Sequence, residues 1–148
     1  MDAQLSNPKE LLLSGDIYVT LRSKASGVRY TYRIYWGKKK RAEGIEVYYV
    51  EVMCGRDNRS GYRYFGWIKD NIFHFDTRNA RVTKEANSVI AFEWFWRYVV
   101  LAESEKARKI MELWISGKCE NCGKKLTVPE SIRKGVGPEC ESYIGARI

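Results

Sequence analysis

Three of the four cysteines lie near the C-terminal end of the chain, at a spacing that suits a metal ion. Cys119 and Cys122 form a Cys-x-x-Cys turn in which two thiolates can bind one ion, and Gly123 accepts the positive φ that such a turn needs. Cys140 is expected in the first turn of a short helix, where the helix dipole and the free amides favour a thiolate. The spacing predicts a structural Zn²⁺ site in a treble-clef-like module.

The fourth ligand of this zinc site is left open by the sequence. Cys54 is the remaining thiol and His74 the only histidine, and either completes a tetrahedral site if the preceding domain packs against the module. The local alternatives are a carboxylate, from Glu120, Glu139 or Glu141, or water. A reduced, metal-free set of thiols supported by packing is the competing interpretation.

The whole tail carries a longer pattern, CxxCGKKLTxPESIxxGxGPxC, from Cys119 to Cys140. It resembles a domain of unknown function that is common in small phage-encoded proteins. In that family the domain often follows a sheet-rich segment and a tryptophan-rich helix, to which Ala91-Phe92-x-Trp94-x-Trp96 is similar. Many members carry a histidine where this chain has Ile115, so the resemblance supplies no fourth ligand. It implies a phage or prophage protein with a zinc-binding tail, and it implies no established activity.

Aromatic and basic residues alternate in a second region with chemical potential. Single-stranded nucleic acid is bound by aromatic faces that stack on bases and by cations that contact phosphates, and each stacked base contributes about 1–3 kcal/mol. The candidate contacts are Arg33, Tyr35, Trp36, Lys38, Lys39, Lys40 and Arg41, with Arg63 from a second cluster and with Lys124 and Lys125 on the rim of the zinc module. The second cluster also holds Arg59, Tyr62, Tyr64, Phe65, Trp67 and Lys69.

The bulk charge agrees with such a partner. The formal net charge is +8 and the pI about 9.4, which favours a polyanion. The competing interpretation is structural: aromatic residues are good strand formers, half of them must face the core, and the lysine run is then a solvated hairpin tip. The sequence thus predicts binding to single-stranded DNA or RNA, with a host protein complex as the alternative partner.

Catalysis has little support in the sequence. A single histidine excludes chemistries that need two, and no serine stands in a nucleophile-like turn beside His74 and Asp76. Glu46 and Glu51 are expected on opposite faces of one strand, and no glycine-rich phosphate loop is present. We therefore expect a protein that is not an enzyme.

The elements that must position these residues are predicted from hydrophobic periodicity. Period-two alternation predicts five short strands, beginning at Asp16 and ending at Phe75, and the lysine run 37–44 is expected to be a hairpin loop. A nearly all-apolar helix follows over residues 87–101 and must be covered on more than one side. A second, amphipathic helix is expected over residues 103–115.

These elements describe an α+β protein with an antiparallel sheet of about five strands packed on two helices. The expected domains are a sheet and helix domain over 1–116 and a zinc-binding module over 117–148. No apolar stretch approaches the length of a signal-peptide core or a membrane span, so we expect a cytoplasmic protein without membrane contact. The predicted function is non-enzymatic nucleic-acid binding in phage infection. The alternative is a protein-directed inhibitor of a host defence or replication enzyme, comparable to an anti-CRISPR inhibitor.

Overall fold

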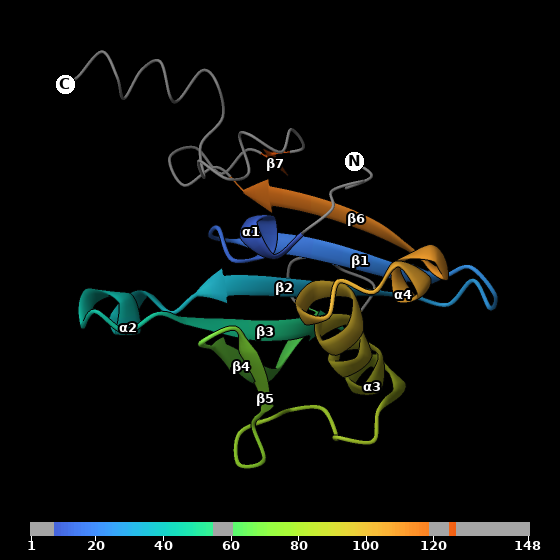
Figure 1. Cartoon of the computed structure of the whole chain (residues 1–148). Helices are drawn as coiled ribbons and strands as arrows, with labels where there is room; N and C mark the ends of the chain where they lie inside the picture. Colours follow the sequence, from blue (N-terminus) through green and yellow to red (C-terminus); the bar gives the residue numbers. More distant parts are fainter. Residues whose placement is uncertain (1–7, 55–60, 119–124, 127–148) are drawn as a thin grey trace.

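The computed structural model describes residues 8–54, 61–118 and 125–126. Within these residues, seven strands form one antiparallel sheet in the order β5-β4-β3-β2-β1-β6-β7 (Figure 1). The strands are β1 Ile17–Ser23, β2 Arg29–Trp36, β3 Val47–Met53, β4 Tyr62–Lys69, β5 Ile72–Phe75, β6 Met111–Lys118 and β7 Lys125–Leu126. The helices are α1 Lys9–Leu12, α2 Lys38–Ala42, α3 Asn87–Trp94, the π-helix η1 Phe95–Leu101, and α4 Glu105–Lys109.

The prediction of an α+β fold built on an antiparallel sheet is confirmed. β1 to β5 occupy the five predicted segments, and each pairs with its neighbour in sequence. The turn between β4 and β5 is tight because Asp70 and Asn71 both adopt positive φ, at 52° and 66°. Two consecutive positive φ values match the right-handed twist of a two-residue hairpin. The chain from β1 to β5 is therefore a simple meander.

The second predicted helix, over residues 103–115, is wrong over most of its length. Only Glu105–Lys109 is helical, and Met111–Lys118 forms strand β6 instead. β6 pairs with β1 along the whole of β1, from Ile17 opposite Gly117 to Ser23 opposite Met111. The segment also alternates with period two, so that Leu113 and Ile115 are fully buried. Pairing with β1, which would otherwise be an exposed edge, outweighs the helical pattern.

The predicted hairpin loop at 37–44 is also different in the structure. Lys38–Ala42 forms the single helical turn α2, which leads into a loop where Gly44 has φ of +82°. The Ile45 N–H donates a hydrogen bond to the Lys40 carbonyl over 2.8 Å, and this bond ties α2 to the start of β3. The lysine run is therefore held at the end of the β2–β3 hairpin.

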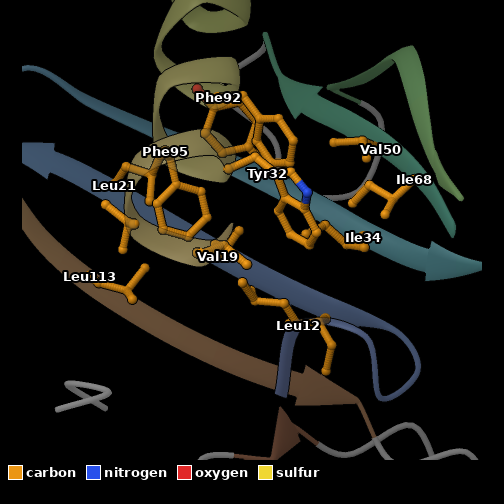
Figure 2. Close-up of a cluster of buried hydrophobic side chains, with 14 of the residues drawn as sticks. Leu12, Val19, Leu21, Tyr32, Ile34, Val50, Ile68, Phe92, Phe95 and Leu113 are labelled. Atoms are coloured by element: carbon orange, nitrogen blue, oxygen red, sulfur yellow. The ribbon is translucent and has the colours of Figure 1, made fainter. Parts of the chain in front are cut away.

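The core lies between one face of the sheet and the helices α1, α3, η1 and α4 (Figures 1 and 2). Val19, Tyr32 and Phe92 are fully buried there, and the Tyr32 hydroxyl donates to the Ser88 carbonyl. The tryptophan-rich helix buries one side only among the described residues. Its outer side carries Ile90 and Tyr98, which are 53% and 43% exposed.

The sheet continues past residue 116. β6 runs through Gly117 to Lys118, and the short strand β7 pairs with it. The predicted treble-clef-like module lies outside the described residues apart from these positions. No helix of the described part is long and apolar enough to cross a membrane.

Candidate nucleic-acid interface

The second face of the sheet carries a row of aromatic side chains. Tyr35 on β2 is directly opposite Tyr49 on β3, Tyr49 is opposite Trp67 on β4, and Trp67 is opposite His74 on β5. The Tyr35 and Tyr49 rings are 5.7 Å apart, and the Trp67 and His74 rings stack at 5.2 Å with 20° between their planes. We call these four residues the aromatic row, and the face that carries them the open face. The helices of the core lie on the opposite side.

A β-bulge in β4 brings Tyr64 onto the same face as Trp67. The β3–β4 register shifts between Val50 and Glu51, so that Val50 is opposite Gly66 whereas Glu51 is opposite Tyr64. Without this extra residue, strict alternation would put Tyr64 and Trp67 on opposite faces. The rings of Tyr49 and Tyr64 consequently meet at 6.0 Å.

Gly66 is required at the bulge because β5 passes very close to it. A Cβ at this position would lie 2.7 Å from the ring of Phe73 and would overlap the backbone carbonyl of His74. Real Cβ atoms do not approach other atoms so closely, so no other residue fits without movement of β5. Gly66 thereby keeps His74 in register with the aromatic row.

Three members of the aromatic row, Tyr35, Tyr49 and Trp67, form with Tyr64 the floor of a groove of about 610 Å³. Its lining residues are Tyr35, Lys40, Ile45, Val47, Tyr49, Tyr64, Trp67, Lys69, Asp76 and Asn79, and we call it the aromatic groove. The two lysines lie at the same end, because Lys69 is opposite Val47 in the β3–β4 register and Lys40 is bonded to Ile45. Both lysines are exposed. Aromatic rings and two cations thus converge on one concave surface.

The other end of the aromatic groove is acidic. Asp76 accepts hydrogen bonds from the backbone N–H groups of Arg78 and Asn79 at 3.1 and 3.0 Å, and the Tyr64 hydroxyl donates to it over 2.9 Å. Desolvation acts to raise the pKa of Asp76, but these hydrogen bonds outweigh it and lower the pKa below its usual value. Burial, with the bond to Asp76, raises the pKa of Tyr64. Asp76 is therefore an ionised acceptor that holds both the Tyr64 hydroxyl and the backbone of the turn at 78–79.

Arg33, a predicted nucleic-acid contact, lies on the open face but is already engaged. Its Nε donates to Asp16 over 2.8 Å, its Nη2 donates to the other oxygen of Asp16 over 2.9 Å, and Nη1 lies 3.5 Å from Glu51. Its guanidinium carbon is 4.3 Å from the centre of the Tyr35 ring. The hydrogen bond to Asp16 raises the pKa of Arg33 further, so the charge is permanent and locally compensated.

Trp36 lies on the covered side of the sheet, away from Tyr35. Its indole stacks on Tyr48 with the ring centres 5.6 Å apart, and the guanidinium carbon of Arg41 lies 3.6 Å from the ring centre. Its Nε1 is buried and has no hydrogen-bond partner among the described residues. Trp36 thus packs on the helix-covered side, and the structure does not bring this ring together with the aromatic row.

The remaining predicted contacts are distributed over several surfaces. Lys38 and Lys39 are exposed on α2 but do not line the aromatic groove. Arg63 is opposite the buried Val52, so it is directed to the helix-covered side. Lys125 lies on β7 at the far edge of the sheet, and Lys124 lies outside the described residues. Among the predicted cations that the structure describes, Lys40 lines the aromatic groove, and Lys69 of the second cluster lines it as well.

Sequence reasoning did not select Tyr49, Asp76 or Asn79. Tyr49 follows Tyr48 in a strand in which alternate residues are buried. This alternation was the signal that could have placed Tyr49 on the face opposite to the buried Tyr48. Asp76 and Asn79 belong to a turn that follows β5, and only the folded chain brings this turn beside β4.

The predicted metal ligands Cys119, Cys122 and Cys140 lie outside the described residues. The two candidates for the fourth ligand are described. Cys54 is an exposed thiol at the end of β3, and His74 stacks on Trp67. Within residues 8–54, 61–118 and 125–126, no three histidine, cysteine or acidic side chains cluster as a metal site would require.

Comparison with known proteins links only the tail to a family. A family of unknown function, DUF6011, matches residues 116–145, a segment that contains all three C-terminal cysteines. No curated protein and no solved structure is significantly similar to the chain.

Proposed function

We propose that this protein binds single-stranded nucleic acid on the open face of its sheet, with bases stacked on the aromatic row and phosphates near Lys40 and Lys69. The observation that carries the proposal is the convergence of four aromatic side chains and two lysines on the aromatic groove. The aromatic side chains are Tyr35, Tyr49, Tyr64 and Trp67. Stacking tolerates any base because every base has a π-face, and the lysines supply the phosphate contacts.

A single strand suits this surface better than a duplex. The aromatic row lies in the sheet, and its rings can stack only on bases that are not already paired and stacked in a helix. The proposal is binding without chemistry. Asp76, the acidic group in the groove, already accepts three hydrogen bonds from Tyr64, Arg78 and Asn79, so it is poorly suited to act as a general base.

The experiment compares the affinity of fluorescently labelled single strands and duplexes for the wild type and for matched aromatic variants. Tyr49→Leu and Trp67→Leu should each weaken single-strand binding about five- to hundredfold, the equivalent of losing one stacked base. Tyr98→Leu removes an exposed aromatic ring from the helical side and should leave the affinity unchanged. Equal affinity for duplex and single strand, or equal losses in all three variants, would contradict the proposal.

For the C-terminal segment we propose a structural zinc ion bound by Cys119, Cys122 and Cys140. Support comes from their spacing, and from the match over residues 116–145, which makes this segment a recurrent unit. The described strands also bear on the fourth ligand. When the strand register is followed across the sheet, Lys118, which precedes Cys119, lies at the same level as His74. Five strand intervals separate the two residues, or about 24 Å at roughly 4.8 Å per interval.

Cys54 is about as remote from Lys118. It lies three strand intervals away and five residues farther along β3 than Tyr49, which together amount to about 22 Å. A zinc ion bound by Cys119 lies much closer than this to Lys118, because adjacent Cα atoms are about 3.8 Å apart and Zn–S bonds are about 2.3 Å. We therefore favour a local carboxylate or water over Cys54 and His74.

A protein partner is the second candidate function, and one surface favours it. An apolar groove of about 450 Å³ lies between the β1–β2 hairpin, α3 and the start of β6, where Val28, Ile90 and Ile110 are 49%, 53% and 58% exposed. Exposed apolar side chains that line one groove are typical of protein contacts. The phage origin and a target in host defence or replication are proposals that rest on the tail motif alone. Capture of a host protein that is lost in Ile90→Asp, with single-strand binding unchanged, would support this second function.

A further inference from the structure

The charges on the open face limit the length of nucleic acid that it can hold. Next to the aromatic row lies the cluster of Asp16, Arg33 and Glu51, in which two carboxylates face one guanidinium. Their side chains are between 17% and 31% exposed, so the excess negative charge is close to the surface. A phosphate that left the groove toward β1 would meet this excess negative charge and an arginine already paired with both carboxylates. A phosphate backbone is therefore disfavoured where β1 and β2 adjoin the aromatic groove, and the next arginines, Arg22 and Arg29, lie farther along these strands.

The side of the aromatic groove that faces away from β1 is closed by the chain itself. After β5, the Ala80 N–H donates to the Asp76 carbonyl over 3.0 Å, and the Arg81 N–H donates to the Tyr64 carbonyl over 2.8 Å. These bonds anchor the segment 76–81 against β4 and make it a wall of the groove. A strand that enters the groove is thus bounded by the wall on one side and by the acidic cluster on another.

The groove also has a chemical direction. Lys40 and Lys69 are at one end, Asp76 is at the other, and the rings of Tyr49 and Trp67 lie between them. An anion is favoured at the lysine end and disfavoured near the Asp76 carboxylate. The volume of about 610 Å³ is in the range of sites that hold one small-molecule ligand.

We propose, on the basis of the function proposed above, that the aromatic groove is a site for one nucleotide. The base lies among Tyr49, Tyr64 and Trp67, and the phosphate lies between Lys40 and Lys69. The protein then contacts one nucleotide of a strand, at an end or in a sharply bent segment, rather than tracking a long stretch of backbone.

Two consequences distinguish this site from an extended single-strand surface. Affinity should be nearly independent of oligonucleotide length, whereas an extended site gains affinity until a span of about 4–16 nucleotides is filled. A nucleoside 5′-monophosphate should compete with a longer strand, and the same nucleoside without its phosphate should compete about tenfold or more weakly.

The test is competition against a labelled oligothymidylate of about 12 nucleotides, within the span of a typical single-strand site. The competitors are adenosine, thymidine and their 5′-monophosphates. The variant Lys40→Ala/Lys69→Ala is compared with Lys106→Ala/Lys109→Ala, which makes the same charge change on exposed lysines of α4. We expect the groove variant to weaken competition by the monophosphates about tenfold and to leave competition by the nucleosides unchanged. The α4 variant should behave as the wild type.

The possible outcomes separate this inference from the function on which it rests. If the labelled strand binds and monophosphates do not displace it, the one-nucleotide site is refuted and single-strand binding stands. If affinity rises steadily with oligonucleotide length, the one-nucleotide site is likewise refuted and single-strand binding stands. If no strand binds, both proposals fail. If the two lysine variants lose monophosphate binding equally, the phosphate is not held in the groove and the inference is wrong. Circular dichroism melting of each variant identifies any loss that is due to unfolding.

Discussion

Replacing Gly66 with alanine tests the close packing of β5 on the bulge that organises the open face. The added methyl group would lie 2.7 Å from two ring atoms of Phe73 and would overlap the carbonyl of His74. Phe73 cannot move away easily, because its ring packs against Phe92 at 5.0 Å and Phe65 at 5.6 Å. A backbone carbonyl in a paired strand is equally constrained. Overpacking of this kind costs about 1–3 kcal/mol, and the contacts on both sides place Gly66→Ala near the upper value.

The expected loss is large enough to measure by thermal and urea unfolding. For a chain of 148 residues, 1 kcal/mol shifts the Tm by about 3–4 °C, so we expect Gly66→Ala to lower the Tm by about 10 °C. Gly44→Ala is the control, because Gly44 has φ of +82° but nothing within 4 Å of an added Cβ. It should cost only the conformational strain of a left-handed residue, about 1 kcal/mol. A loss in Gly66→Ala no larger than that in Gly44→Ala would refute the close approach of β5.

Three further predictions concern the zinc site, the sheet and the tyrosines. His74→Ala and Cys54→Ser should each retain about one zinc per chain by elemental analysis, whereas Cys119→Ser should lose it. Freshly purified wild-type protein that contains no zinc would refute the zinc proposal. Leu113→Ala should destabilise the fold by about 2–5 kcal/mol in urea unfolding because this β6 side chain is fully buried, and Glu112→Ala, which breaks only a half-exposed ion pair with Arg22, should change stability by less than about 1 kcal/mol. Burial is the main cause that raises the pKa values of Tyr35 and Tyr62 to about 12, above the usual value of 10.0. These tyrosines therefore ionise at a lower pH in the unfolded chain than in the folded one, and the stability of the fold should fall as the pH rises from about 10 toward 12. Urea midpoints that stay constant across this window would contradict the burial of these hydroxyls, and Tyr62→Phe should reduce the slope.

The course of the chain from β1 to β5 could be predicted because each strand alternates with period two and is bounded by turn residues. The tail motif and the net charge were likewise readable, since a Cys-x-x-Cys turn and an excess of lysine and arginine need no tertiary context to be recognised. The segment 111–118 could not be assigned in this way. Leu113 and Ile115 fit a strand, but Ala107, Ile110, Met111 and Trp114 fit a helix equally well, and the choice depends on a partner strand far away in the sequence.

The candidate site shows the same division. The sequence by itself determined that aromatic and basic residues alternate in β2 and β4, and therefore that half of them share a face. It could not determine which face the helices cover. Alternation sorts the residues onto two faces, but it does not say which of the two faces will be buried. The covering helices bury Tyr32. Trp36, on the same face, lies against Tyr48 and Arg41, while Tyr35 stays on the open face. The bulge at Gly66 then reverses the alternation within β4 and brings Tyr64 and Trp67 together. Only the tertiary structure decided this, because the bulge depends on the close passage of β5 and on pairing with β3.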